Sequence, residues 1–241
     1  MNYHKSDIKP DMDRGESISM MEPLLISEHS RYRREVTDLA MELATESAKL
    51  KHSLPPAIQA SLANMVRAMN CYYSNLIEGH DTHPIAIERA LQGHYSSDAK
   101  KRNLQKEAKA HIMVQEWIDH GGIKNNFFSR ETICEIHRRF CEVLPEDLLH
   151  ADDHDSAKKT KIIPGFLRNR DVKVGKHIAV SPGAVPRFLA RFESVYGGLG
   201  KMETTLALAA SHHRLLWIHP FLDGNGCSGL IKMDKKVKRI N

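Results

Sequence analysis

The sequence lacks any segment that would place the protein in a membrane or export it. Its first 22 residues are polar and contain no apolar core of the kind found in a secretory signal peptide. No apolar run approaches the roughly 20 residues that a membrane-spanning helix needs. We therefore expect a soluble, cytoplasmic protein without a membrane partner.

Cysteine and aromatic residues are also scarce. The chain has 4 cysteines, and no two of them have the Cys-x-x-Cys spacing, which argues against a zinc ribbon and against a disulfide-linked scaffold. Aromatic residues make up only 6% of the chain, whereas 41% of its residues are hydrophobic and 27% charged. This composition is typical of a globular protein rather than a disordered one. A length of 241 residues suffices for one domain or two small ones.

The charge balance is only mildly basic. There are 35 Lys and Arg residues against 30 Asp and Glu residues, which gives a net charge of +5. A small positive excess suits a partner that carries phosphate. The basic residues near the C-terminus are few and are expected to be solvated, so nucleic acid is not an expected partner.

Hydrophobic periodicity predicts an all-α fold class. Within residues 56–70, apolar side chains recur at the spacing of one helical face. The predicted helices cover residues 31–52, 56–70, 84–91, 103–120, 129–143, 186–196 and 202–218. Glycine pairs or prolines bound several of these segments, as expected at helix ends.

Two segments depart from the helical period. Residues 144–163 alternate acidic and basic clusters without apolar periodicity, and we expect a loop there. Residues 170–180 alternate apolar and polar side chains on both sides of Gly175. This alternation predicts one short β-hairpin with its turn near Gly175 and Lys176.

The most informative segment is residues 219–226, His-Pro-Phe-Leu-Asp-Gly-Asn-Gly. Its two glycines allow successive backbone N–H groups to point into one concavity, which is an anion-binding arrangement. Asp223 offers the oxygen ligand that Mg²⁺ prefers, and His219 is a base that can be neutral near pH 7. Taken alone, Asp-Gly-Asn-Gly is an ordinary turn; preceded by His-Pro-Phe, it indicates phosphoryl or nucleotidyl transfer.

This octapeptide resembles the signature of Fic (Fido) domains, His-Pro-Phe-x-(Asp/Glu)-Gly-Asn-Gly. Residues 74–79, Ser-Asn-Leu-Ile-Glu-Gly, resemble the N-terminal inhibitory motif of that family. Residues 164–168, Pro-Gly-Phe-Leu-Arg, with the hairpin that follows, resemble its Pro-Gly-x-x-Arg segment and its target-docking flap. The resemblance begins near residue 30, and it implies a Fic/Fido helical bundle with one short β-hairpin flap.

The resemblance also implies a reaction and its site residues. Most Fic enzymes transfer AMP from ATP, with Mg²⁺, to a Ser, Thr or Tyr hydroxyl of a protein target. His219 would deprotonate that hydroxyl and Asp223 would hold Mg²⁺. The nucleotide-binding residues would be Phe221, Gly224, Asn225 and Gly226, with Phe221 packed inward. The inhibitory residues would be Ser74, Glu78 and Gly79, with Glu78 obstructing the γ-phosphate position.

The sequence departs from the family after Gly226. The family signature continues Arg-x-x-Arg, and the corresponding positions here hold Cys227 and Leu230, neither of which offers a cationic fork for phosphate. We therefore expect weak or absent AMP transfer, and a chain truncated or frameshifted after the signature. Two alternatives stay open: a non-catalytic, degenerate Fic-like binding protein, or a Fic variant that removes AMP or transfers another phosphate-containing group.

The expected organisation has four parts. Residues 1–22 form a flexible arm, residues 23–100 the N-terminal helices with the inhibitory motif, residues 101–226 the Fic core, and residues 227–241 a divergent basic tail. A homodimer is a further option under this resemblance.

Overall fold

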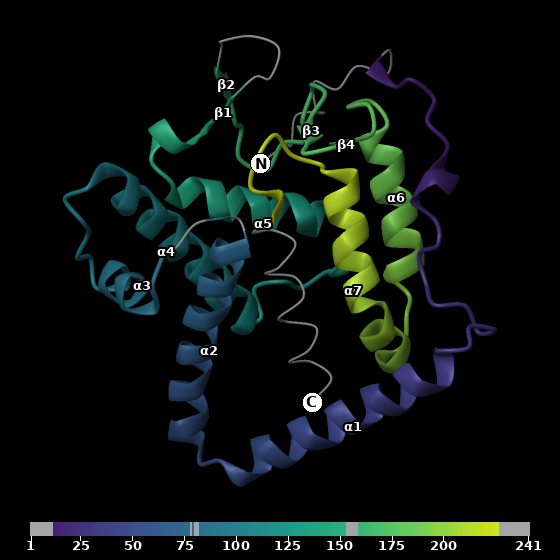
Figure 1. Ribbon diagram of the computed structural model, residues 1–241, viewed down its shortest axis with the longest axis horizontal. Coiled ribbons are helices and arrows are strands. Elements are labelled where there is room, and N and C mark those ends of the chain that lie inside the picture. The colour runs from purple at the N-terminus through teal and green to yellow at the C-terminus, as the bar shows by residue number, and fades with distance from the viewer. Residues whose placement is uncertain (1–11, 78, 80–81, 153–158, 227–241) are drawn as a thin grey trace.

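The computed structural model describes residues 12–77, 79, 82–152 and 159–226. Within these residues the chain forms seven α-helices and two pairs of short strands (Figure 1). The helices are α1 (Arg33–Ser53), α2 (Pro56–Ile77), α3 (Pro84–Leu91), α4 (Ala99–Asp119), α5 (Arg130–Val143), α6 (Val185–Tyr196) and α7 (Lys201–Ile218). Two 3-10 turns, η2 (Ile18–Met21) and η3 (Glu146–Leu148), complete the helical elements. The all-α expectation is confirmed.

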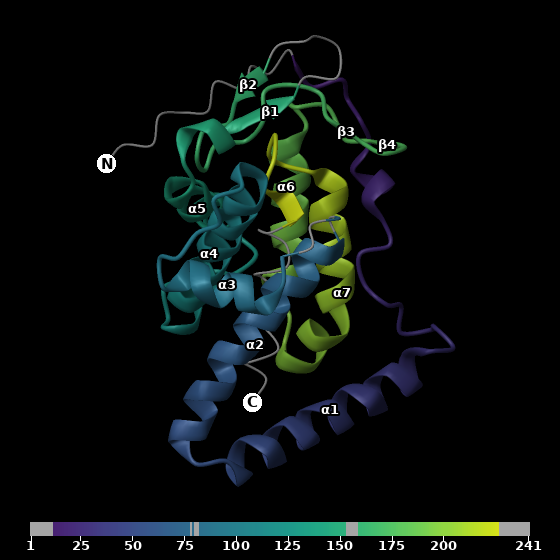
Figure 2. The same cartoon turned by 60° about the vertical axis from the view of Figure 1, so that its left-hand side comes forward.

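Helices α4, α5, α6 and α7 enclose the main hydrophobic core. Helix α5 packs against α4 and α6, and α6 packs against α7. Helices α2 and α3 pack against α4 on the opposite flank from α6, whereas α1 crosses the base of the molecule and contacts α7 (Figures 1 and 2). The apolar side chains of α1 stay largely exposed, Leu39 and Leu43 among them.

Local sequence explains the two helices that matter most for the site. Ser129 caps α5 by accepting a hydrogen bond from the Thr132 N–H at 3.1 Å. Buried residues then follow along one face of α5 and one face of α6. In α6, Pro186 lies in the first turn, where its missing N–H costs nothing, and Gly197 follows the last residue.

The predicted hairpin is present, and a second one accompanies it. Strands β3 (Lys173–Val174) and β4 (His177–Ile178) pair antiparallel around Gly175, which adopts a positive φ of 59°. Strands β1 (His150–Asp152) and β2 (Lys159–Lys161) also pair antiparallel. The expectation of a plain loop over residues 144–163, and of only one hairpin, was therefore wrong. Short, highly charged strands carry no apolar alternation, so periodicity could not reveal this second hairpin.

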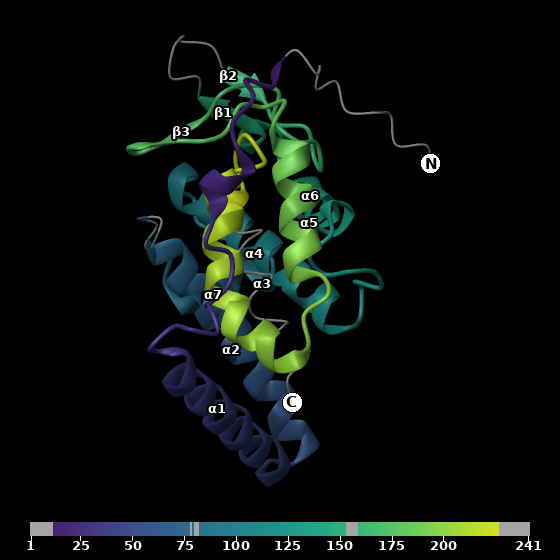
Figure 3. The same ribbon diagram turned by 90° about the vertical axis from the view of Figure 1, so that its right-hand side faces the viewer.

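Residues 12–22 are the described part of the expected arm over residues 1–22, and they lie along α6 (Figure 3). Asp13 forms an ion pair with Arg187 of α6, with an N–O distance of 2.6 Å. Met21 is fully buried in the main core. Both contacts join residues far apart in the sequence, and local polarity could not indicate them. We call residues 12–24 the N-terminal strap.

No helix in the described part of the chain is both long and apolar enough to cross a membrane. The helix α2 begins at Pro56 as predicted but continues to Ile77, seven residues beyond the expected end at residue 70.

Candidate functional site

The site is centred on His219, the residue that ends α7. His219 has φ 51° and ψ 64°, a left-handed conformation, and it is the one non-glycine residue with positive φ among those described. Its N–H still donates to the Leu215 carbonyl at 3.0 Å, and Pro220 then prevents the helix from continuing. A non-glycine side chain in this region costs about 1–2 kcal/mol, so surrounding contacts must hold it there.

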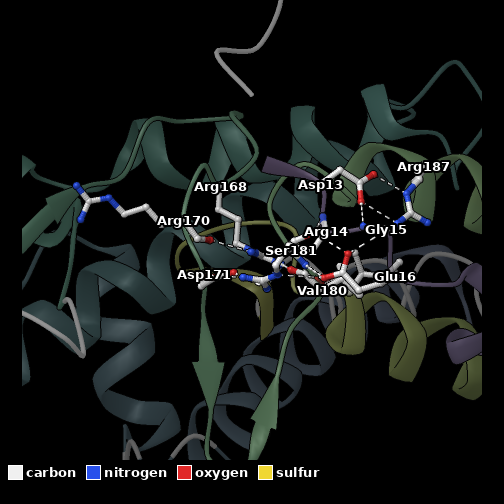
Figure 4. Close-up of polar contacts among 11 residues, drawn as sticks. Asp13, Arg14, Gly15, Glu16, Arg168, Arg170, Asp171, Val180, Ser181 and Arg187 are labelled. Atoms are coloured by element: carbon white, nitrogen blue, oxygen red, sulfur yellow. Dashed lines mark hydrogen bonds and ion pairs between the residues drawn. The ribbon is translucent and has the colours of Figure 1, made fainter. Parts of the chain in front are cut away.

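Arg168 supplies those contacts. Its side chain is 1% exposed, and its Nε donates to the His219 carbonyl at 2.7 Å. The same guanidinium donates to the carbonyls of Arg170 and Val180 (Figure 4). It also donates, more weakly, to the Ile218 carbonyl. The Arg168 backbone N–H also donates to the Pro220 carbonyl at 2.9 Å. Burial lowers the pKa of Arg168 to about 10, so it stays cationic at neutral pH.

The N-terminal strap supports the same region from outside. Arg14 forms two hydrogen bonds with Asp171, at 2.7 and 2.9 Å. Glu16 accepts hydrogen bonds from both the backbone N–H and the hydroxyl of Ser181, at 2.8 and 2.7 Å (Figure 4). Asp171 precedes β3 and Ser181 follows β4. The N-terminal strap therefore contacts both ends of the segment that contains β3 and β4. Arg168 contacts the same two ends through the carbonyls of Arg170 and Val180.

Two hydrogen bonds close the loop after His219. The Phe221 N–H donates to Asn225 Oδ1 at 2.9 Å, and Asn225 Nδ2 donates to the Phe221 carbonyl at 2.9 Å. Asn225 is 4% exposed and Phe221 is 1% exposed. The inward packing of Phe221 agrees with its expected place. Both groups of the Asn225 amide form hydrogen bonds within the loop. The expected contact of Asn225 with phosphate stays a prediction.

A buried histidine on α5 supports this loop from below. The His137 ring stacks on Phe221, with ring centroids 3.8 Å apart and planes 4° apart. Its Nδ1 accepts from the Gly165 N–H at 2.9 Å, so Nε2 carries the proton and donates to the Asp223 carbonyl at 3.2 Å. Burial lowers the pKa of His137 to about 4. His137 is therefore neutral at pH 7 and fixed in one tautomer.

The glycine of the turn is required by geometry. Gly224 has φ 74°, and a Cβ added there would lie 3.4 Å from Cδ2 of His137. Its N–H donates to Oδ1 of Asp223 at 2.7 Å. Gly226, with Asn225, begins a helical turn at the end of the described residues. The Gly224 N–H is thus directed to the Asp223 carboxylate in this structure.

The His219 imidazole is neutral at physiological pH. Burial lowers its pKa to about 4, and the positive charges of Arg168 and His177 act in the same direction, whereas a hydrogen bond with the Leu216 backbone opposes them. His177 of β4 also makes a 2.8 Å hydrogen bond through Nε2 with the Trp217 carbonyl. The hairpin therefore contacts the last turn of α7 directly.

Asp223 is the expected magnesium ligand. It is exposed, and only one of its carboxylate oxygens accepts the Gly224 N–H. The described residues contain no group of three or more His, Cys, Asp or Glu side chains able to hold a metal ion. One free carboxylate oxygen still fits Mg²⁺, because this ion is often held by one or two carboxylates together with substrate phosphates.

The inhibitory motif is only partly described. Ser74 is buried, and its hydroxyl donates to the Asn70 carbonyl within α2 at 2.8 Å. Gly79 has φ 80°, and its N–H donates to the Leu76 carbonyl at 3.0 Å in the turn that follows α2. Glu78, Cys227 and Leu230 lie outside the described residues. The inhibitory roles of Ser74, Glu78 and Gly79 stay predictions.

Comparison with known proteins decides the family. Residues 127–235 match the family model described as Fic/DOC family. This segment of the chain is a Fic domain. The match includes α5, β3, β4, α6, α7 and the whole 219–226 segment, which is the Fic motif, and it extends nine residues beyond Gly226.

Curated relatives carry the name Protein adenylyltransferase Fic. The relative from Drosophila erecta is 25% identical over 224 residues, covering 88% of this chain and 42% of the relative. The relative from Culex quinquefasciatus is 28% identical over 174 residues, covering 70% of this chain and 31% of the relative. The chain thus spans less than half the length of these relatives.

Solved structures support the same fold. A Fic family protein from Desulfovibrio desulfuricans G20 has a TM-score of 0.61 and 15% identity, covering 90% of this chain and 59% of that one. A Fic domain containing signaling protein from Bacteroides thetaiotaomicron VPI-5482 has a TM-score of 0.59 and 21% identity, covering 82% of this chain and 71% of that one. The chain therefore adopts the Fic fold.

Sequence reasoning identified the Fic motif but missed the residues that support it. It noted Arg168 only as part of a resemblance, and gave no role to His137, His177 or the N-terminal strap. The Gly165–Arg168 spacing was the one signal for Arg168. No local pattern could have revealed the strap contacts.

Proposed function

We propose that this chain belongs to the AMP-transfer class of Fic proteins, with a protein Ser, Thr or Tyr hydroxyl as acceptor and ATP as donor. The observation that carries the proposal is His219. Arg168 and Pro220 hold this neutral imidazole at the exit of α7, directly before the Asp223–Gly226 turn. A general base must be unprotonated and held in position before the reaction begins.

In this reaction the target oxygen attacks the α-phosphorus of ATP. The bond between the α-phosphorus and the bridging oxygen breaks, pyrophosphate leaves, and the hydroxyl proton passes to the His219 imidazole. Mg²⁺ would neutralise phosphate charge when bound, and Asp223 is the residue that would hold it. Gly224, Asn225 and Gly226 would contribute backbone N–H groups to the phosphates, while Phe221 anchors the loop. Turning the Gly224 N–H toward phosphate requires the Asp223 carboxylate to release it.

The chain's own sequence limits this activity. Cys227 and Leu230 replace the two arginines of the family signature, and loss of one preorganised charged contact costs about 2–4 kcal/mol of transition-state stabilisation. The family motif implies that Glu78 restrains the site. Removing Glu78 deletes one negative charge but does not restore either of the two missing arginines. The wild-type chain and the Glu78→Gly variant should both label weakly.

The test is incubation with Mg²⁺ and ATP labelled on its α-phosphate, read as label retained on the protein after denaturation. Cys227→Arg with Leu230→Arg and Glu78→Gly should increase labelling, and a further His219→Ala change should abolish the increase. ATP labelled on its γ-phosphate is the control, because AMP transfer leaves that phosphate in pyrophosphate. Strong labelling by the Glu78→Gly variant alone would show that AMP transfer does not depend on the two missing arginines. Labelling that survives His219→Ala would contradict the base role.

The replacement of the two signature arginines by Cys227 and Leu230 also favours one alternative, a non-catalytic Fic-like binding protein. It predicts that the triple variant folds normally, as judged by circular dichroism, and still transfers no label. Calorimetric titration with ATP then separates a chain that binds nucleotide from one that does not. A protein partner, and a homodimer, would be sought by size-exclusion chromatography with light scattering.

A further inference from the structure

A cavity of about 620 Å³ opens between α3, the loop that follows it and the first turns of α4. Its size is within the range of small-molecule sites in proteins. None of the residues that line it belongs to the Fic motif at 219–226. Helix α3 lies at the outer flank of the molecule, whereas the motif loop lies beside α5 (Figures 1 and 2).

Gln105 holds the walls of this cavity together. Its side chain is buried, 5% exposed; its Oε1 accepts from the Ser96 N–H at 2.7 Å, and its Nε2 donates to the Ala86 carbonyl at 3.0 Å. The two hydrogen bonds join α4 to the preceding loop and to α3. The cavity is therefore preformed, which lowers the entropic cost of binding a ligand.

The charged side chains that line the cavity are all basic. Arg89 and Lys101 carry full charges, while no acidic residue is among the described lining residues. Neither Arg89 nor Lys101 forms an ion pair or a side-chain hydrogen bond with any described residue. Two uncompensated cations facing one cavity favour an anion, and phosphate in particular.

A further group points to an organic ligand rather than a simple ion. The Tyr95 ring lines the cavity, and Lys109 places its Nζ 5.9 Å from the centroid of this ring. An aromatic ring at a cationic rim suits a ligand with a planar group beside its phosphate.

We infer that this cavity binds a small phosphorylated ligand with a planar ring, of the size of a mononucleotide. Arg89 and Lys101 bind the phosphate, and Tyr95 stacks on the ring. This site is separate from the proposed AMP-transfer reaction, and it requires neither Mg²⁺ nor His219.

The test is calorimetric titration of the full chain with AMP in magnesium-free buffer. Arg89→Ala and Lys101→Ala should each weaken AMP binding by roughly tenfold, because each removes a charge-assisted contact. Lys100→Ala is the matched control: Lys100 is exposed in the same turn of α4, but it does not line the cavity. It should bind AMP as the wild type does. Inorganic phosphate and adenosine, each lacking one half of the ligand, should both bind more weakly than AMP.

The inference is overturned if AMP does not bind at millimolar concentration. It is also overturned if Arg89→Ala and Lys101→Ala leave the affinity for AMP unchanged. If Gly224→Ala weakens AMP binding while these two variants do not, AMP binds at the Fic motif instead.

Discussion

Replacing Arg168 by methionine should disturb both the stability of the fold and the state of His219. Arg168 is 1% exposed and directs its guanidinium to four backbone carbonyls. Two of them belong to Ile218 and His219 at the end of α7, and the other two flank the hairpin. Methionine fills a similar volume and leaves all four carbonyls without this donor.

The size of the effect follows from those contacts. A hydrogen bond to a charged group contributes about 1.5–3 kcal/mol, and breaking a buried charged network costs about 3–5 kcal/mol. Water can replace part of the loss at the edge of the loop, so we expect about 3–5 kcal/mol rather than the sum of separate bonds. For a chain of this length, that corresponds to a fall in melting temperature of roughly 6–20 °C.

The second readout is the pKa of His219, which reports on the position of its ring and on the nearby Arg168 charge. It is lowered to about 4 by burial together with the charges of Arg168 and His177. In Arg168→Met the loop loses its anchor and the ring loses one neighbouring cation, so the pKa should rise toward its ordinary value of 6.5. An NMR titration of the histidine Cε1 signals measures it, alongside thermal unfolding by circular dichroism.

Arg34→Met is the matched control for this experiment. Arg34 is exposed on α1, and the same change there should shift the melting temperature by little. The reasoning is refuted if Arg168→Met melts within 2 °C of the wild type, a tolerance of about 1 kcal/mol. It is also refuted if the variant is destabilised while the His219 titration stays unchanged, because Arg168 would then act on the fold alone.

Three other perturbations test the structure. His111 is buried with no hydrogen bond on either ring nitrogen, so His111→Leu should stabilise the protein by about 1–3 kcal/mol in urea unfolding at pH 7; a loss of stability would contradict this. Burial lowers the pKa values of His111 and His137 from 6.5 to about 4. Between these two pH values the unfolded state binds more protons than the folded state, so the free energy of unfolding should fall as the pH drops from 6.5 to about 4. A urea midpoint that does not change with pH in this interval would contradict the prediction. A Cβ at Gly183 would lie 2.3 Å from the Asp13 nitrogen, so Gly183→Ala should displace the N-terminal strap, cost about 1–3 kcal/mol and expose residues 12–22 to limited proteolysis; wild-type resistance would show that the strap is not packed there.

Several elements could be predicted from the sequence because their causes are local. The helices α6 and α7 begin within one residue of their expected starts and end where predicted, since a proline or glycine bounds each and apolar residues follow one face. The β3–β4 turn depends on Gly175, whose positive φ glycine adopts without strain. The Fic motif was likewise recognisable as a run of eight residues.

What the sequence alone determined, then, is the helical class, the hairpin and the residues of the motif, because each is written in neighbouring positions. Only the tertiary structure decided how the motif is held. Arg168 reaches a carbonyl 51 residues away, and His137 reaches one 86 residues away. The polarity of residues 12–22 does not reveal their partners, yet their charges are paired with residues of α6 and of the hairpin ends. Periodicity reports which face of an element is apolar, whereas a buried hydrogen bond depends on which distant backbone group lies opposite, and that is set only when the chain packs.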